Sequence, residues 1–463
     1  MAGELRTISP VDGSVYVERS MATLDEIEKV LARARDARQD WAGLPLEERA
    51  TMLRAMVQAF KRQSNKISEE LSWQMGRPIS QAPAEVKGFE ERANHMIDIA
   101  SSALSEIRLP ARADLDRFIR RQPLGVVFTV APWNYPFLTA VNSVVPALMA
   151  GNTLVLKHSA QTPLCAERMV EAGAKAGLPE GVFQFLHLGH SHTARVINDS
   201  RVDFVAFTGS VEAGREIERA ATGRFIGVGL ELGGKDPAYV RSDANLQHAV
   251  ENLADGAFYN SGQSCCGIER IYVHESLYSD FVDAMVEQVK SYRLGNPLDP
   301  ITTLGPLARA SAVRHLDAQI RDACRKGARA LIDSSGFPRA RPGTAYMAPQ
   351  VLVDVDHRMS LMMDESFGPV VGIMKVRSDD EAVELMNDSP FGLTASVWTR
   401  DHERAIELGM RVDTGTWFMN RCDYLDPGLA WVGVKDSGRG CTLSQIGYEQ
   451  LTRPMSFHMK TSV

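Results

Sequence analysis

The chain has 463 residues, which is too long for one ordinary domain and typical of two or three. Hydrophobic residues make up 44% and charged residues 24%, so the composition is that of a globular protein with large cores and excludes disordered, collagen-like and coiled-coil chains. The net charge is −7 and no basic block is present, which argues against nucleic acid as a partner because phosphate binding needs clustered cations.

The six cysteines and the hydropathy pattern narrow the class further. The cysteine spacing fits neither a disulfide framework nor a zinc site, so we expect a reduced compartment and no bound metal. The longest apolar stretches, such as 124–131, are far shorter than the ~20 residues that a membrane span needs. The segment Met1–Arg6 lacks the apolar core of a signal peptide, and we therefore expect a cytoplasmic protein without a membrane partner.

The first hundred residues are predicted to be mostly helical. Thr23 can cap a helix over 23–47, because acidic residues follow it directly and apolar residues then recur at helical spacing. The same pattern continues through 47–60 and 85–104. Residues 112–121 mix charges with apolar side chains, as expected for an extended segment with one face in water.

From residue 124 onward, short β-rich runs alternate with helical stretches. Strands are predicted over 124–130, 153–156, 182–186, 202–207 and 225–230, and helices over 137–150, 163–176, 191–199 and 211–222. This alternation predicts an α/β unit with a parallel sheet, whose ligands bind beyond the carboxyl ends of the strands.

A second α/β stretch is predicted between about 245 and 440. Its strands are expected over 270–273, 370–376, 395–398 and 415–419, and its helices over 276–292, 308–326, 379–387 and 401–411. The segment 451–460 again looks extended, and we expect it to pair with 112–121.

A cluster around Cys265 has the composition of an accessible thiol. The glycine and small polar residues of 260–264 precede two adjacent cysteines, Cys265 and Cys266. Such residues allow a sharp turn and leave a thiol open to solvent, as nucleophilic chemistry requires. The alternative is that both cysteines are small buried hydrophobes.

Two further polar residues follow predicted strands. Glu231 ends an apolar run and precedes Gly233 and Gly234, an arrangement suited to a partly desolvated carboxylate and to general-base work. Asn134 lies in the segment Pro132–Pro136, where a side-chain amide after a strand is a natural oxyanion donor. The alternative for this segment is a proline-bounded turn with aromatic packing.

The chain has no G-x-G-x-x-G fingerprint for a dinucleotide. Instead, Gly209 and Ser210 lie between a predicted strand and a helix, where free backbone amides suit a pyrophosphate. A Glu-x-Phe-Gly-Pro motif follows at 365–369.

Taken in chain order, these clusters resemble the aldehyde dehydrogenase superfamily over essentially the whole chain. The resemblance implies that Cys265 is the nucleophile, that Glu231 is the general base, and that Asn134 and the Cys265 N–H hold the oxyanion. It also implies three parts: a Rossmann-like cofactor domain over 1–109 and 124–232, an α/β catalytic domain over 233–440, and a small β oligomerisation arm over 110–123 and 441–463. Accordingly, we expect NAD(P)-dependent oxidation of an aldehyde to a carboxylic acid by a homodimer or homotetramer.

The resemblance further assigns the cofactor contacts, which are Trp133, Lys157, Ser159, Gly209, Ser210, Glu365 and Phe367. Family members that prefer NAD often carry a glutamate three residues after the lysine that matches Lys157. This chain has Ala160 there, so we expect NADP to be used competently, with NAD as the alternative.

The substrate loop implied by the resemblance follows the strand predicted at 415–419. The residues expected to contact substrate are Tyr135, Arg421, Asp423 and Leu425. The pair Lys157-His158 resembles a bacterial branch that includes succinate-semialdehyde dehydrogenases, and Arg421 could pair with a substrate carboxylate, although Asp423 would oppose it. We therefore expect succinate semialdehyde or a similar small aldehyde.

Two alternatives stay open at this point. A non-catalytic structural or binding descendant of the fold would not need Asn134, Glu231, Cys265 and Glu365 together. A dehydrogenase that transfers the acyl group to coenzyme A would generally lack the glutamate that this chain has at 231.

Overall fold

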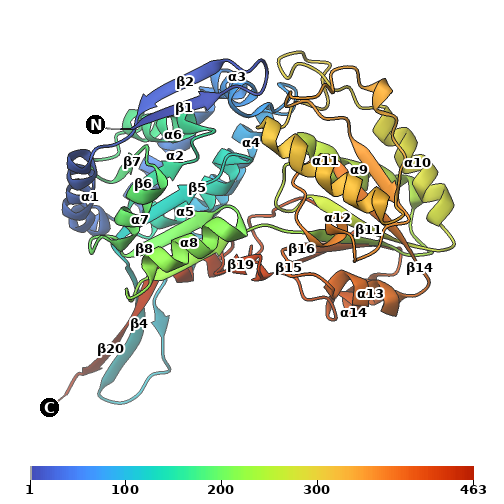
Figure 1. Cartoon of the computed structure of the whole chain (residues 1–463). Helices are drawn as coiled ribbons and strands as arrows, with labels where there is room; N and C mark the ends of the chain where they lie inside the picture. Colours follow the sequence, from blue (N-terminus) through green and yellow to red (C-terminus); the bar gives the residue numbers. More distant parts are fainter. Residues whose placement is uncertain (1–2, 463) are drawn as a thin grey trace.

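The computed structural model describes residues 3–462 and confirms an α/β fold with two large sheets. The first sheet has six strands in the order β19-β9-β8-β5-β6-β7, and β5 to β9 are mutually parallel. The strands are β5 (Val126–Ala131), β6 (Thr153–His158), β7 (Phe183–Phe185), β8 (Phe204–Thr208), β9 (Gly227–Glu231) and β19 (Gly438–Arg439). The predicted parallel sheet is therefore present (Figure 1).

Helices connect and cover this sheet. Those between its strands are α5 (Pro136–Met149), α6 (Pro163–Lys175), α7 (His190–Asn198) and α8 (Val211–Ala221). The N-terminal part adds β1 (Glu4–Ile8), β2 (Val15–Ser20), α1 (Leu24–Gly43), α2 (Leu46–Lys61), α3 (Ser64–Met75) and α4 (Pro83–Ala103). The hairpin β1–β2 and helix α3 were not predicted.

The single helix predicted over 23–47 is wrong. Helix α1 ends at Gly43, and α2 begins at Leu46 after the extended residue Leu44, whose φ and ψ are −66° and 142°. Pro45 is the cause, because proline disfavours helical backbone in the residue before it and has no N–H to continue the helix. The predicted Thr23 cap is confirmed, since its hydroxyl accepts from the amide of Glu26.

The second sheet has seven strands in the order β12-β13-β14-β11-β10-β16-β17. They are β10 (Asp236–Val240), β11 (Ile268–His274), β12 (Arg329–Ala330), β13 (Gln350–Val353), β14 (Val370–Val376), β16 (Thr394–Trp398) and β17 (Thr416–Met419). Its helices are α9 (Leu246–Phe258), α10 (Tyr278–Lys290), α11 (Ala310–Arg325), α12 (Ser360–Met363), α13 (Asp379–Asn387) and α14 (His402–Gly409). A two-stranded ribbon of β15 (Phe391–Gly392) and β18 (Val434–Lys435) lies apart from both large sheets.

The predicted pairing between the two extended segments is confirmed. Strand β20 (Thr452–Lys460) pairs antiparallel with β4 (Leu115–Pro123), and β3 (Ile107–Arg108) adds a short third strand. Phe118 and Phe457 stack across the pair with ring centroids 4.5 Å apart. The β4–β20 pair projects from the body of the molecule (Figure 1).

The chain does not pass directly from the second sheet into the projecting β4–β20 pair at the expected boundary between residues 440 and 441. Strand β19 belongs to the first sheet, where it pairs antiparallel with β9. Tyr448 and Leu451 are buried in the core beside α5. Of the residues expected in the arm after 440, those of β20 therefore form the projecting part.

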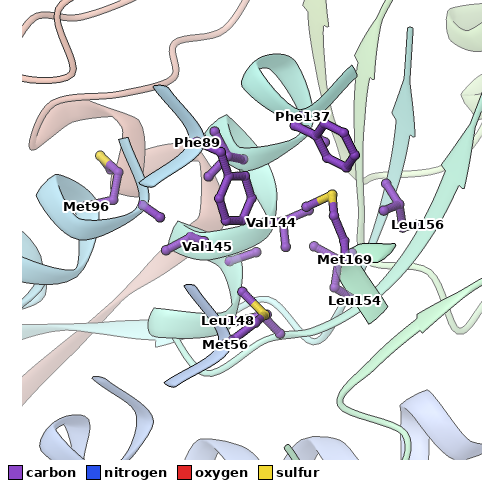
Figure 2. Packing of buried hydrophobic residues seen from close by; sticks show 14 of the residues in the cluster. Met56, Phe89, Met96, Phe137, Val144, Val145, Leu148, Leu154, Leu156 and Met169 are labelled. Carbon is purple, nitrogen blue, oxygen red and sulfur yellow. The ribbon is translucent and has the colours of Figure 1, made fainter. Parts of the chain in front are cut away.

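Helix α5 is the centre of that core. Nearly all of its residues are buried, as expected for a helix that is apolar on every side. Figure 2 shows Phe137, Val144, Val145 and Leu148 of α5 among side chains of α2, α4, β6 and α6. This packing fixes the start of α5, and therefore the position of the Pro132–Pro136 segment that precedes it. Among the described residues, none of the helices is both long and apolar enough to span a membrane.

Candidate active site

The cysteine loop connects α9 to β11 through a strained turn. Asn260 and Ser261 have φ angles of 52° and 57°, in the left-handed region that non-glycine residues seldom adopt. After this turn Cys265 is partly exposed, whereas Cys266 is buried and donates its thiol to Asp423 at 2.9 Å. Of the two adjacent thiols, the structure leaves only Cys265 open to solvent.

The glutamate loop packs directly against the cysteine loop. Strand β9 ends at Glu231, and a Cβ added at Gly234 would overlap the carbonyl oxygen of Cys265. Only glycine allows the two backbones to approach so closely. Glu231 and Cys265 consequently line the same cavity, whose volume is about 350 Å³.

Two threonines hold the Glu231 carboxylate. Thr442 donates to one oxygen at 2.5 Å, and Thr208 donates to the other at 3.1 Å. Burial raises the pKa of Glu231, while the hydroxyl donors act in the opposite direction because they favour the ionised form. A raised pKa makes the ionised carboxylate a stronger base, as general-base work requires.

Asn134 is tied to the cysteine loop through its main chain. Its carbonyl accepts from Arg77 and from the Asn260 side-chain amide, the latter at 3.3 Å. Arg77 also donates to the Asn260 side-chain oxygen at 3.2 Å. The side chain of Asn134 is 4% exposed. This network fixes the Asn134 segment relative to Cys265.

A buried ion pair that no sequence motif indicated supports this arrangement. Arg77 is paired with Glu85, and both side chains are almost completely inaccessible. Glu85 accepts the amides of Phe137 and Leu138 at the start of α5, at 2.9 and 3.0 Å. Arg77 also lies over the Tyr135 ring, 4.5 Å from its centroid.

The cofactor residues expected from the first sheet lie where its parallel strands end. Lys157 is the second-last residue of β6, and Ser159 follows directly after that strand. Gly209 and Ser210 follow β8, where the Ser210 hydroxyl accepts from the amide of Ala213 and caps α8. Burial lowers the pKa of Lys157 to about 8.

The motif at 365–369 reaches the same region from the second sheet. The Glu365 carboxylate accepts from the Gly234 amide at 2.9 Å, and a Cβ at Gly233 would come within 2.5 Å of it. Phe367 packs edge-on against Trp133, with ring centroids 5.6 Å apart. Burial, together with the negative charge of Glu269, raises the pKa of Glu365 to about 8.

A second buried ion pair holds this motif in place and was also missed from the sequence. Lys235 donates to Glu269 at 2.5 Å and to Ser366 at 2.9 Å. Glu269 in turn accepts the amides of Ser366 and Phe367, both at 2.8 Å. Neither Lys235 nor Glu269 has a local pattern that identifies its partner.

The residues expected to contact substrate separate into two groups. Tyr135, Asp423 and Leu425 line the cavity that contains Cys265. Arg421 is exposed and lies over the Tyr424 ring, 4.0 Å from its centroid, and it is not part of the cavity lining. The structure therefore gives no support to an ion pair between Arg421 and a substrate in this cavity.

Asp423 is the unusual group of this cavity. It has a φ of 47°, and its Oδ1 accepts from Cys266 and from Ser264, the latter at 3.2 Å. Burial raises the pKa of Asp423 to about 7, and the charge of Asp255 acts in the same direction. Within residues 3–462, no three histidine, cysteine or acidic side chains are grouped so that they could hold a metal ion.

Comparisons with known proteins identify the family of this chain. The model of the aldehyde dehydrogenase family matches residues 2–457. "Succinate-semialdehyde dehydrogenase [NADP(+)] 1" of Mycobacterium tuberculosis is 34% identical over 451 residues, which cover 96% of this chain and 97% of that protein. An aldehyde dehydrogenase of Paenarthrobacter nicotinovorans is 35% identical over 449 residues, with 96% and 97% covered.

Solved structures show the same similarity over the whole chain. Succinic semialdehyde dehydrogenase from Streptococcus pyogenes in complex with NADP⁺ superposes with a TM-score of 0.94 at 29% identity, covering 98% of this chain and 100% of that one. PnpE in complex with nicotinamide adenine dinucleotide gives 0.94 at 29% identity, covering 100% and 95%. The chain therefore belongs to the aldehyde dehydrogenase family of NAD(P)-dependent oxidoreductases.

Proposed function

We propose that this protein oxidises a small aldehyde to its carboxylic acid by a covalent, hydrolytic route. The observation that carries the proposal is the contact between the glutamate and cysteine loops at Gly234, which brings Glu231 and the open thiol of Cys265 to one cavity. A structural or binding descendant of the fold would have no need for this combination.

Cys265 is the nucleophile of the proposed reaction. Its thiolate adds to the aldehyde carbon and forms a thiohemiacetal, whose oxyanion is held by the Asn134 side-chain amide and the Cys265 N–H. The hydrogen bonds from Arg77 and Asn260 to the Asn134 carbonyl fix the backbone from which this donor projects.

Glu231 completes the cycle. Loss of hydride from the thiohemiacetal carbon leaves a thioester on Cys265, which must be hydrolysed before a second turnover. Glu231 removes a proton from the attacking water, and the acyl carbon leaves the sulfur as a carboxylate. The presence of Glu231 favours water over coenzyme A as the acyl acceptor.

The donor set at the two sheets fits a nicotinamide dinucleotide, which accepts the hydride. Lys157 and Ser159 are proposed to bind the adenosine ribose, and the α8 amides after Gly209 and Ser210 the pyrophosphate. The remaining proposed contacts are Trp133, Glu365 and Phe367. The lack of a carboxylate at Ala160 and the NADP(+) named for the mycobacterial relative support NADP as a cofactor.

The relatives named for succinate semialdehyde support a small substrate, and the cavity volume of about 350 Å³ is in keeping with one. The geometry does not favour the acid end of that compound, because Arg421 lies outside the cavity. We further propose that the projecting sheet of β20, β4 and β3 mediates assembly into a homodimer or homotetramer, since β20 and β3 are its edge strands.

Aldehyde-dependent formation of reduced cofactor by wild type and Cys265→Ala tests the reaction, with Cys324→Ala as the matched control because Cys324 is exposed on α11. We expect the first substitution to abolish turnover and the second to leave it intact. Near wild-type turnover by Cys265→Ala would refute the proposal. Release of acyl-coenzyme A without free acid would replace it with the acylating reaction.

A further inference from the structure

The cavity that contains Cys265 has an acidic and aromatic lining. Its acids besides Glu231 include Asp423 and Asp255, and Glu91 lies on the same lining. Its large aromatic side chains are Tyr135, Tyr259, Tyr424 and Trp431. Carboxylates together with aromatic faces form the usual environment of a bound organic cation.

Asp423 keeps one carboxylate oxygen free for a ligand. Both hydrogen bonds from the protein, from Cys266 and Ser264, converge on Oδ1. Within residues 3–462, Oδ2 takes part in no hydrogen bond. A carboxylate with one oxygen fixed and the other open is well suited to accept from a substrate donor.

The hydroxyl of Tyr135 is a second polar group without a partner. It is buried and forms no hydrogen bond with any residue that the structure describes. Tyr135 and Asp423 line the same cavity. A buried hydroxyl left unpaired is costly, so a polar group of a bound ligand would be stabilised there.

The three cations on the lining differ in their partners and exposure. Arg77 is paired with Glu85. Arg92 is buried, and it donates through one guanidinium nitrogen to the carbonyl oxygen of Leu138 at 2.6 Å and to Asn142 at 3.3 Å. Lys87 is exposed. The lining holds five acidic side chains against three cationic ones, so a bound cation is favoured over a bound carboxylate.

We propose that the substrate is a short amino-aldehyde, whose protonated amine binds to Asp423 while its aldehyde carbon faces Cys265. The Tyr135 hydroxyl accepts a second ammonium hydrogen, and the Trp431 ring provides an aromatic face for the cation. This substrate class rests on the proposed aldehyde oxidation and makes it more specific.

The proposal is tested by comparing kcat/KM for 3-aminopropanal, 3-hydroxypropanal, propanal and succinate semialdehyde with NADP. We expect the amine to exceed propanal by about tenfold to a hundredfold, which is the range for a charge-assisted hydrogen bond. A preference for succinate semialdehyde would overturn the proposal, and a preference for 3-hydroxypropanal would replace the cation with a neutral donor. Turnover of propanal alone would still support aldehyde oxidation, so the two proposals fail separately.

Substitutions in the loop after β17 test whether Asp423 causes the preference for 3-aminopropanal. Asp423→Asn should lower the preference for 3-aminopropanal over propanal by about tenfold. Asp426→Asn removes the same charge from an exposed position three residues away, and it should leave the preference unchanged. An equal ratio in Asp423→Asn and wild type would overturn the assignment to Asp423.

Inhibition of the wild-type protein by small ions gives a second test, which does not depend on the folding of Asp423→Asn. In the wild-type protein, propylammonium should inhibit propanal turnover competitively, and propanoate should inhibit at least tenfold more weakly. The reverse order would show that the cavity selects anions and would refute the proposal.

Discussion

The hydroxyl of Thr442 provides the most direct test of how the protein sets the basicity of Glu231. Thr442 donates to one carboxylate oxygen at 2.5 Å, and Thr208 donates to the other at 3.1 Å. Substitution Thr442→Val keeps the shape of the side chain and removes only the shorter of these two bonds. Because the donor stabilises the ionised carboxylate, its loss must raise the pKa of Glu231 above its already raised value.

The size of the effect follows from the strength of the lost bond. A hydrogen bond to a charged group contributes about 1.5–3 kcal/mol, and one pKa unit corresponds to about 1.36 kcal/mol, so the upper bound is a shift of about one to two units. Because Glu231 also faces the cavity, water can replace part of the lost hydrogen bond, and we expect the pKa of Glu231 to rise by about one unit.

The sign of this shift has a definite kinetic consequence. Only ionised Glu231 can accept a proton from water, so the acidic limb of the kcat–pH profile should move to higher pH by about one unit in Thr442→Val. The assay is steady-state formation of reduced cofactor across the pH range. Thr222→Val is the control, because the Thr222 hydroxyl donates to the carbonyl oxygen of Glu218 on the exposed end of α8. An acidic limb that stays in place, or moves to lower pH, would refute this account of Glu231.

Three further perturbations test other parts of the molecule. Arg77→Met leaves Glu85 buried without its partner, so unfolding in urea should show a loss of about 3–5 kcal/mol, and the double variant with Glu85→Gln should recover part of it. Ala160→Glu adds a negative charge where the 2′-phosphate of NADP is proposed to bind, and the ratio of KM for NADP to KM for NAD should rise about tenfold; an unchanged ratio would show that this position does not contact the phosphate. A chain ending at Thr452 keeps the buried Leu451 but loses most of β20, and light scattering should then report a monomer rather than an oligomer.

The sequence was most informative where local pattern and chemistry coincide. The parallel strands β5, β6 and β8 contain runs of apolar residues. Each residue proposed to act in catalysis lies at the end of a strand or in a segment with glycines or prolines. The pairing of β4 with β20 was also predicted, because both segments carry alternating charges and apolar residues. Pro45 breaks the helix although the apolar periodicity continues on both sides of it, so periodicity alone predicts one helix where the chain has two.

The supports of the site could not be predicted, because they are long-range pairs of buried charges. Arg77 lies on no motif, and its partners Glu85, Asn134 and Asn260 come from three separate segments. Lys235 adjoins the glutamate loop, but nothing in the sequence shows that Glu269 is its counterion. A buried charge must be paired, yet the sequence does not reveal with which residue.

The loop after β17 shows how one turn decides what such a cavity can bind. In the sequence, Arg421 and Asp423 are charges of opposite sign two residues apart, and either one could have faced the substrate. The backbone adopts left-handed conformations at Asn420 and Asp423, with φ angles of 55° and 47°. Arg421 then stacks on Tyr424 at the surface, and Asp423 lines the cavity beside Cys266. A change of sign at the cavity wall reverses the preferred charge of the substrate, so the identity of the substrate depends on a backbone conformation that no residue pattern in this loop specifies.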